Sequence, residues 1–276
     1  MDKASRRKEV RIVEETIKNY DSYTSGMKKS SADKLFWMSK IEKINTVVDF
    51  GCADGTLIRE MNSEMPDLQY IGYDNSKAMI SLAGIRTPHE LENIQYVSDL
   101  KESLKENNPN KTLLNLSSVI HEVYSYSNIN GIDKFWNNVF GYDYGYIAIR
   151  DFCVSRSVNR QSDINDYTKV IRGADELQIM DYESIWGSLR DNRNLIHYLM
   201  KYRYKENWDR EVRENYFPIT LEQLLSKIPT YKYEIIYFED YILPFTSSKI
   251  KQDFDVDIHD NTHVKLLLRL KEGVNN

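Results

Sequence analysis

Short apolar runs alternate with amphipathic stretches along most of this chain. Runs with the length and the β-branched or aromatic content of strands are TVVDF, LQYIGYD, IQYV, KTLLNLS and GYIAIR. Stretches with helical spacing lie between them, at TLIREMNSEM, at SKAMISLAG, and from HEVYSYS to about Phe140. Strands that alternate with helices of about ten to fifteen residues predict βαβ units and a parallel sheet. TVVDF and YIAIR are nearly continuous in apolar residues, as expected for strands covered on both faces.

The rhythm changes on either side of this core. A polar helix is predicted from Arg6 to about Tyr20, and a second helix from about Ser31 to Lys43. Residues 152–215 are polar, mostly helical in period and without a strand candidate. The alternation resumes at Thr220 with the helix TLEQLLSKI and the strands YKYEIIYF and THVKLLLRL. We therefore expect a helical insertion at 152–215 that covers one end of the sheet.

Composition places the chain among globular proteins. Of its 276 residues, 41% are hydrophobic and 29% charged, so a sizeable core can form. The net charge of −5 disfavours a general coat for nucleic acid, although a local basic surface remains compatible with it. Two cysteines make no disulfide framework, and no Cys/His spacing predicts a metal site. The N-terminus does not resemble a secretory signal and no apolar run could span a membrane, so we expect a cytoplasmic location.

A glycine-rich turn follows the first core strand. In DFGCADGT, Gly51, Ala53 and Gly55 come directly behind TVVDF. Small residues there let backbone N–H groups approach a ligand, although a tight turn without any ligand would also need them. The spacing is not the dinucleotide fingerprint G-x-G-x-x-G, because the last glycine comes one residue too early. Asp49 precedes the turn, and its charge disfavours a pyrophosphate but favours a cationic ligand.

DFGCADGT resembles the first motif of the class I S-adenosylmethionine-dependent methyltransferases, which reads roughly [DE]-x-G-x-G-x-G. Ala53 departs from it at the middle glycine. The resemblance covers about Thr46 to Asp151 well and the C-terminal strand pair loosely. It implies an α/β fold with a Rossmann-like, mostly parallel seven-stranded sheet flanked by helices, here with a helical insertion after the fifth strand. It also implies S-adenosyl-L-methionine as the cofactor.

The resemblance divides the chain into four parts. Residues 1–45 form an N-terminal helical segment, and residues 46–151 form the cofactor-binding core. Residues 152–215 form the helical insertion, or cap, and residues 216–276 complete the core sheet.

Family resemblance also assigns roles around the turn. The turn makes room for the amino-acid end of the cofactor, and Asp49 helps to hold its ammonium group. Asp74 ends the second strand, where a carboxylate accepts hydrogen bonds from the ribose hydroxyls. Asp99 follows the third strand and meets the adenine amino group. Either aspartate could instead cap a helix. The implied cofactor-binding positions are Asp49, Gly51, Cys52, Ala53, Gly55, Asp74, Asn75, Met79, Ser98, Asp99, Leu100 and Ser117.

Candidates for the chemistry follow the fourth and fifth strands. Methyl transfer from a sulfonium needs positioning, and needs a base only if the acceptor must lose a proton. His121 and Glu122 come just after the fourth strand, and histidine suits a base near neutral pH. Arg150 and Asp151 end the fifth strand. The alternatives are a packing or capping histidine, a glutamate that favours a helix N-terminus, and, for Arg150 and Asp151, a salt bridge that pins the insertion to the sheet.

The insertion bears on the substrate. Helical spacing puts an apolar stripe on one side of residues 189–213, formed by Ile196, Met200, Tyr204, Trp208 and Val212. Arg203 and Arg210 share another face, which either is solvated or meets phosphate groups.

Three functions stay open at this point. The first is a methyltransferase that acts on an oxygen or nitrogen acceptor of a small molecule, which the acidic charge and a lid-like insertion favour. The second is an RNA or nucleotide methyltransferase, and the third is a non-catalytic partner subunit that binds the cofactor. The sequence predicts no membrane partner and does not decide the oligomeric state.

Overall fold

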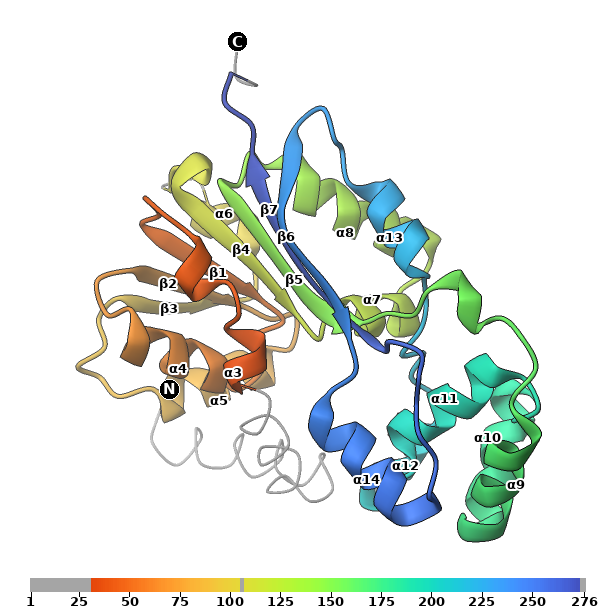
Figure 1. Cartoon of the computed structure of the whole chain (residues 1–276). Coiled ribbons are helices and arrows are strands. Elements are labelled where there is room, and N and C mark those ends of the chain that lie inside the picture. Colours follow the sequence, from red (N-terminus) through yellow and green to blue (C-terminus); the bar gives the residue numbers. More distant parts are fainter. Residues whose placement is uncertain (1–30, 105–106, 274–276) are drawn as a thin grey trace.

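A computed structural model describes residues 31–104 and 107–273. The predicted helix from Arg6 to Tyr20 lies outside these residues. A seven-stranded sheet runs through the molecule in the order β3-β2-β1-β4-β5-β7-β6 (Figure 1). The strands are β1 (Thr46–Phe50), β2 (Gln69–Tyr73), β3 (Ile94–Val97), β4 (Thr112–Ser117), β5 (Tyr146–Phe152), β6 (Tyr233–Tyr241) and β7 (His263–Leu270). Each strand that the sequence predicts is present.

The sheet is mixed rather than wholly parallel. Strands β3, β2, β1, β4 and β5 pair in parallel. Strand β7 lies between β5 and β6 and is antiparallel to both. The two C-terminal strands therefore form an antiparallel hairpin at one side of an otherwise parallel sheet.

Helices cover both faces of the sheet, and each face has its own core. The first face packs against α4 (Thr56–Glu64) and the 3₁₀ helix η1 (Met38–Lys40), through Trp37, Ile58 and Met61. The second face packs against helices that include α7 and α8, through Val48, Leu116 and Ile149. The first face also carries α3 (Ser31–Lys34) and α5 (Lys77–Arg86). The helices of the second face are α6 (Leu100–Leu104), α7 (Ile120–Tyr126), α8 (Ile129–Gly141) and α13 (Leu221–Lys227). The 3₁₀ helix η2 (Pro109–Lys111) precedes β4.

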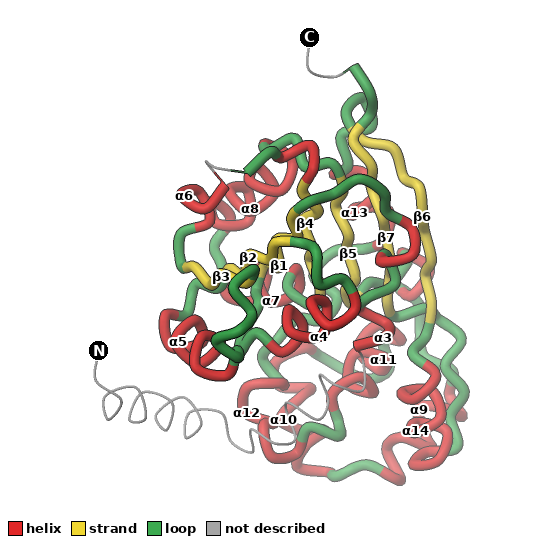
Figure 2. The backbone as a smooth tube through the Cα atoms, turned by 90° about the vertical axis from the view of Figure 1, so that its left-hand side faces the viewer, coloured by secondary structure: helices red, strands yellow, loops and turns green. Residues whose placement is uncertain are grey.

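A third core lies beyond the end of the sheet at which β4 and β5 finish (Figures 1 and 2). Residues 153–217, called the helical region below, supply most of it. α14 (Pro244–Phe254), from the connection between β6 and β7, adds Ile250 and Phe254. The elements of the helical region are η3 (Arg156–Val158), α9 (Ile164–Gly173), α10 (Glu176–Trp186), α11 (Asn192–Lys201), η4 (Lys205–Asn207) and α12 (Trp208–Glu211). The predicted four-part division of the chain stays a prediction.

Two predicted helices are shorter than expected, and those predictions are wrong. The helix at Ser31 ends at Lys34, and after it the chain turns so that Trp37 is fully buried beside β1. The stripe helix at 189–213 also breaks, because α11 ends at Lys201. The buried Lys201 Nζ donates to backbone oxygens of Glu211 and Glu214, which holds the returning chain against the helix end.

The break divides the predicted apolar stripe. Ile196, Met200 and Val212 are buried in the third core as expected. Trp208 is half-buried against that core, whereas Tyr204 is 42% exposed. The helix α14, between β6 and β7, is present although the sequence pattern did not predict it.

Candidate active site

The glycine turn is folded against the end of β2. Gly51, Ala53 and Gly55 all have positive φ, of 80°, 46° and 75°. The amides of Gly51 and Cys52 both donate to the carbonyl of Tyr73, at 2.8 and 3.0 Å. The positive φ values explain why small residues occupy these positions.

Close packing also requires glycine at position 55. A Cβ at this position would overlap the hydroxyl of Tyr96. That hydroxyl is fixed by a 2.8 Å hydrogen bond with Thr87. A Cβ at Gly51 would come within 2.8 Å of Val119, at the start of α7. The turn is thus built for close packing as well as for any ligand.

Asp49 is a buried carboxylate beside this turn. It is 3% exposed, and its Oδ1 accepts a 2.8 Å hydrogen bond from Asn115 Nδ2 on β4. Burial raises the Asp49 pKa to about 6, although the Asn115 bond and the nearby Lys34 lower it. Sequence reasoning missed Asn115, yet a single amide inside the apolar run TLLNLS is a signal that could have identified it.

Asp74 links the turn to the start of α5. Its Oδ2 accepts from the Ala53 amide at 3.0 Å, and its Oδ1 accepts from the Ser76 amide at 2.8 Å. The α5 N-cap is Ser76, whose Oγ accepts from Met79 N, so Asp74 stands one step outside the helix. Burial raises the pKa of Asp74, although the hydrogen bonds from the two backbone amides lower it. Each carboxylate oxygen keeps a further lone pair for a ligand.

The predicted adenine-side residues lie at the end of β3. The Asp74 amide donates to Val97 O at 3.2 Å, which sets the ends of β2 and β3 side by side. Asp99 is exposed and accepts from the Lys101 amide at 3.0 Å. Tyr73 has a raised pKa, first through burial and then through the charges of Asp74 and Asp99. Of the other positions, Asn75 and Ser98 are exposed, Met79 and Ser117 are partly buried, and Leu100 is buried.

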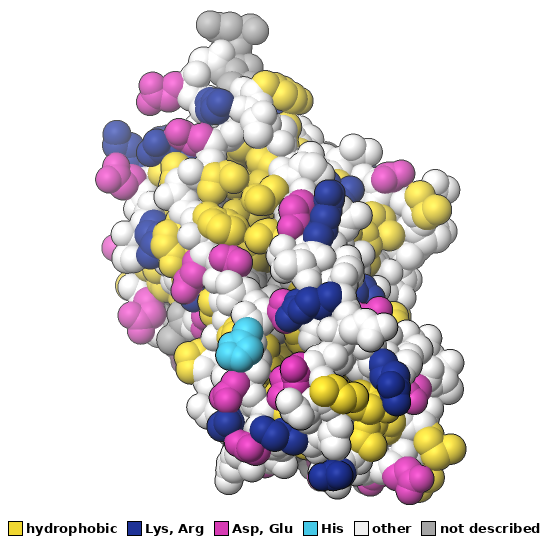
Figure 3. Space-filling model, turned by 45° about the vertical axis from the view of Figure 1, so that its right-hand side comes forward, with side chains coloured by type: hydrophobic (Ala, Val, Ile, Leu, Met, Phe, Trp, Pro, Cys, Tyr) yellow, Lys and Arg dark blue, Asp and Glu magenta, His cyan; other side chains and the backbone are white. Residues whose placement is uncertain are grey.

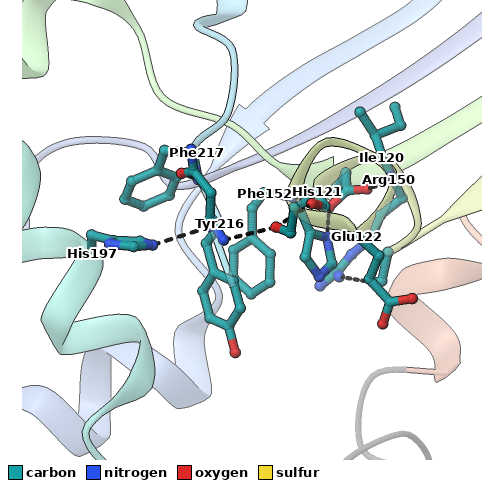
Figure 4. Close-up of polar contacts among 12 residues, drawn as sticks. Ile120, His121, Glu122, Arg150, Phe152, His197, Tyr216 and Phe217 are labelled. Atoms are coloured by element: carbon teal, nitrogen blue, oxygen red, sulfur yellow. Dashed lines mark hydrogen bonds and ion pairs between the residues drawn. The ribbon is translucent and has the colours of Figure 1, made fainter. Parts of the chain in front are cut away.

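His121, labelled in Figure 4, forms a buried pair with Asp151 on the second face of the sheet. His121 Nδ1 lies 2.5 Å from Asp151 Oδ1. Burial opposes the charge on each partner. Even so, Asp151 raises the pKa of His121, and His121 lowers the pKa of Asp151. Asp151 also accepts from the amides of Ile120 and Phe152, at 2.6 and 2.7 Å, so it fixes the start of α7.

Aromatic rings complete the surroundings of His121. Phe152 and Tyr216 meet its ring edge-on, with centroids 5.1 and 5.4 Å away. Tyr216 belongs to the helical region, and it stacks on Phe152 at 4.1 Å. The helical region therefore contacts the predicted base directly.

Glu122 joins α7 to the helical region. Arg210 donates to Glu122 at 3.1 Å and to Glu214 at 2.9 Å. Tyr126 donates to the same Glu214 at 2.9 Å. Burial raises the pKa of Glu122, His121 lowers it, and the neighbouring Glu214 raises it further.

Arg150 points to the first face of the sheet and does not pair with Asp151. Its Nε donates to Asp33 at 2.8 Å and to the Tyr241 hydroxyl at 3.3 Å. Its Nη1 donates to Ser118 Oγ at 3.0 Å. Neighbouring residues of a strand face opposite sides, so the side chains of Arg150 and Asp151 have different partners.

The structure thus brings the predicted residues together in two groups. Those on the first face are Asp49 and Arg150, with the turn and Asp74 at the strand ends. Those on the second face are His121, Glu122 and Asp151. Among the described residues, no group of three or more metal-ligating side chains could hold an ion. No helix in the described part of the chain combines the length and apolar character needed to cross a membrane.

Comparison with solved structures agrees with this architecture. A SAM-dependent methyltransferase from Anabaena variabilis matches with a TM-score of 0.50 and 12% identity, over 87% of this chain and 83% of that one. PKMT2 from Rickettsia typhi matches with a TM-score of 0.50 and 16% identity, over 88% of this chain and 52% of that one. The plantazolicin methyltransferase BamL, solved with SAH, has a TM-score of 0.48 at 12% identity, over 91% and 88% of the two chains. No protein-family model matches the sequence, and neither does any curated protein.

The chain therefore has the fold of the class I S-adenosylmethionine-dependent methyltransferases. The strand order, the antiparallel β7 and the glycine turn after β1 all agree with the resemblance inferred from the sequence.

Proposed function

We propose that this protein is an enzyme that transfers the methyl group of S-adenosyl-L-methionine to an oxygen or nitrogen atom of a small molecule. The observation that carries the proposal is Asp49, a buried carboxylate at the carboxyl edge of β1 beside a turn of small residues. A buried carboxylate with a raised pKa is stabilised by a cationic ligand. The cofactor carries such a cation in its ammonium group.

The remaining cofactor contacts follow from the ends of neighbouring strands. Asp74 would accept hydrogen bonds from the ribose hydroxyls, since its two oxygens are held in place by backbone amides. Asp99 would meet the adenine amino group beyond β3. Ser117 ends β4, two residues after the Asn115 that holds Asp49, and would lie between the cofactor and the acceptor. These residues orient the cofactor, which supplies the electrophilic methyl group.

His121 would serve as the base for an acceptor that must lose a proton. Its Nδ1 is occupied by Asp151, which leaves Nε2 to take the proton. Asp151 positions the ring and stabilises the imidazolium that forms. Phenolic or amine acceptors fit this chemistry, because each must lose a proton to the base as it gains the methyl group.

The helical region would enclose the acceptor. It lies at the carboxyl edge of the sheet, where α/β folds bind ligands (Figure 1). Its Arg210 is held by Glu122 and Glu214, which leaves less positive charge for a nucleic acid. On the face drawn in Figure 3, basic and acidic side chains are interspersed rather than gathered into one basic surface. These features favour a small molecule over RNA.

Purification followed by mass spectrometry of the bound molecules tests the cofactor. Calorimetry should give micromolar binding of S-adenosylmethionine or its demethylated product, about −8 kcal/mol. A screen for transfer of a tritiated methyl group to metabolite pools and to RNA then tests the acceptor. A folded protein that binds neither cofactor form would contradict the proposal. Binding without transfer to any pool would favour the non-catalytic partner subunit.

The salt dependence of substrate binding distinguishes an RNA substrate from a small-molecule substrate. Replacing Arg203 and Arg210 with alanine should leave turnover of a neutral small molecule nearly unchanged. With an RNA substrate, the same change should weaken binding and flatten the log–log salt slope by about two.

A further inference from the structure

Two buried polar atoms at the carboxyl edge have no hydrogen-bond partner among residues 31–104 and 107–273. They are Nη2 of Arg150 on β5 and Oγ of Ser117 on β4. Ser117 and Arg150 are register partners in the parallel pair β4–β5, so their side chains leave the sheet on the same face. An unpartnered buried donor is unfavourable in a folded protein, and it commonly marks a place that a ligand or an ion occupies.

The guanidinium of Arg150 is fixed by hydrogen bonds to Nε and Nη1, whereas Nη2 has no partner among the described residues. Asp33 and Tyr241 take Nε, and Ser118 takes Nη1. The side chain is 4% exposed, so it cannot turn Nη2 into bulk solvent. A guanidinium fixed in this way presents its free edge in one direction, as a site for a planar or tetrahedral oxyanion requires.

The surroundings of Arg150 on this side hold charged groups of both signs. Arg150 shares Asp33 with Lys265, which lies 2.8 Å from that carboxylate and 3.1 Å from Glu239. Lys34 is also buried, and its pKa is lowered first by burial and then by the positive charge of Arg150. Asp49, Glu60 and Asp151 act in the opposite sense and raise the Lys34 pKa.

Asp49 lies on β1 and accepts from Asn115 on β4, which places a negative charge on the cofactor side. Arg150 is on the same face of the sheet but on β5, which β4 separates from β1. Building on the proposed function, we propose that the acceptor carries a carboxylate or phosphate group, whose oxygens accept hydrogen bonds from Arg150 Nη2 and Ser117 Oγ. This group anchors the acceptor while the methylated atom lies toward the cofactor. The substrate class is thus an acidic small molecule.

Inorganic phosphate titrated into protein saturated with S-adenosylhomocysteine tests the site. Phosphorus NMR line broadening should show saturable binding to the unchanged protein. Ser117→Ala and Arg150→Gln should each weaken phosphate binding by about tenfold or more. Arg150→Gln should leave S-adenosylhomocysteine affinity within about twofold, because Arg150 is not among the cofactor-binding positions. Ser117→Ala removes an atom without a partner, so its fold should persist even if Arg150→Gln misfolds. Ser226→Ala and Arg269→Gln, on exposed parts of α13 and β7, are matched controls.

Two outcomes would overturn the inference. The first is phosphate binding that is absent, or that survives both changes. The second is a loss of S-adenosylmethionine affinity in both variants that decarboxylated S-adenosylmethionine does not show, because the site would then hold the cofactor's own carboxylate. Failure of the unchanged protein to bind S-adenosylhomocysteine would instead contradict the proposed function. Phosphate binding can then still be measured on the ligand-free protein.

Discussion

Asp49 on β1 and Asn115 on β4 share a buried hydrogen bond of 2.8 Å across two parallel strands. The Asp49 pKa is raised to about 6 in the fold, against about 3.9 in an unfolded chain. Its contribution to stability is therefore fully present below pH 3.9 and is lost as the pH rises through 6. At neutral pH, the charged carboxylate destabilises the ligand-free protein by about 2–3 kcal/mol.

Asp49→Asn should thus stabilise the ligand-free protein and weaken cofactor binding. Urea unfolding at pH 7.5 should show a gain of about 1–3 kcal/mol, which shrinks toward pH 4. Calorimetry should show at least a tenfold loss of cofactor affinity, since the cationic group loses its partner. Equal stability of the two proteins at pH 7.5 would contradict the assigned cost of the buried charge.

Asp74→Ala should weaken cofactor binding by about 1.5–3 kcal/mol without unfolding the protein. The change removes the ribose acceptor and also frees the amides of Ala53 and Ser76. Ser76→Ala is the matched control, because it removes only the α5 cap, at about 1 kcal/mol of stability. If Asp74→Ala lowers the stability but leaves the cofactor affinity unchanged, Asp74 serves only the turn.

The His121–Asp151 pair predicts a pH-dependent rate. Turnover should rise with pH through the raised pKa of His121, because the base must be neutral. Asp151→Asn should move the midpoint to lower pH and reduce turnover, and His121→Gln should abolish it. His259→Gln changes an exposed histidine and should leave the profile unaltered. A rate that persists in His121→Gln would exclude His121 as the base.

The same pair predicts a window of stability. The contribution of His121 to the free energy of unfolding is fully present below about pH 6.5, the pKa of histidine in an unfolded chain. It is lost as the pH rises through the raised pKa of His121 in the folded protein. The Asp151 contribution is present above about pH 3.9 and is lost as the pH falls through the lowered folded pKa. Urea unfolding across this range should show a shallower pH dependence in His121→Gln than in the unchanged protein. Parallel curves for the two proteins would show that the pair does not couple to folding.

Gly55→Ala should destabilise the protein by about 1–3 kcal/mol, since the new Cβ meets both a positive φ of 75° and the Tyr96 ring. Gly84→Ala is the opposite case. Outside its own helix backbone, no atom of the described residues lies within 4 Å of a Cβ there, and the position is helical, so about 0.5–1 kcal/mol of stability should be gained. Thermal unfolding of the two variants should shift the melting temperature in opposite directions. A neutral Gly55→Ala would mean that Tyr96 moves aside freely.

Local pattern was enough to predict the strands of the sheet and the tight turn after β1. Each core strand is an apolar run bounded by polar residues, and the turn residues reveal themselves by size and spacing alone. Asp49, Asp74 and Asp99 could be found because strand ends in this fold meet at one edge. Ser117 was named as well, although its unpartnered hydroxyl could not be foreseen.

Contacts between residues far apart in the chain could not be predicted from the sequence. Arg150 bonds to Asp33 across 117 positions of the chain, and no spacing rule connects them. The pattern at 189–213 is helical throughout, but a buried Lys201 that holds two distant carbonyls ends α11 early. Tertiary contacts overrode local propensity in both cases.

Strand β7 follows β6 in the chain but is inserted between β5 and β6. During synthesis, β6 therefore emerges with no strand to pair with, and the apolar edge of β5 stays open until β7 arrives. Val264, Leu266 and Leu268 are fully buried once it does. The nascent chain is thus exposed to edge-to-edge association during that interval, and closing the sheet is a late, non-local step of folding.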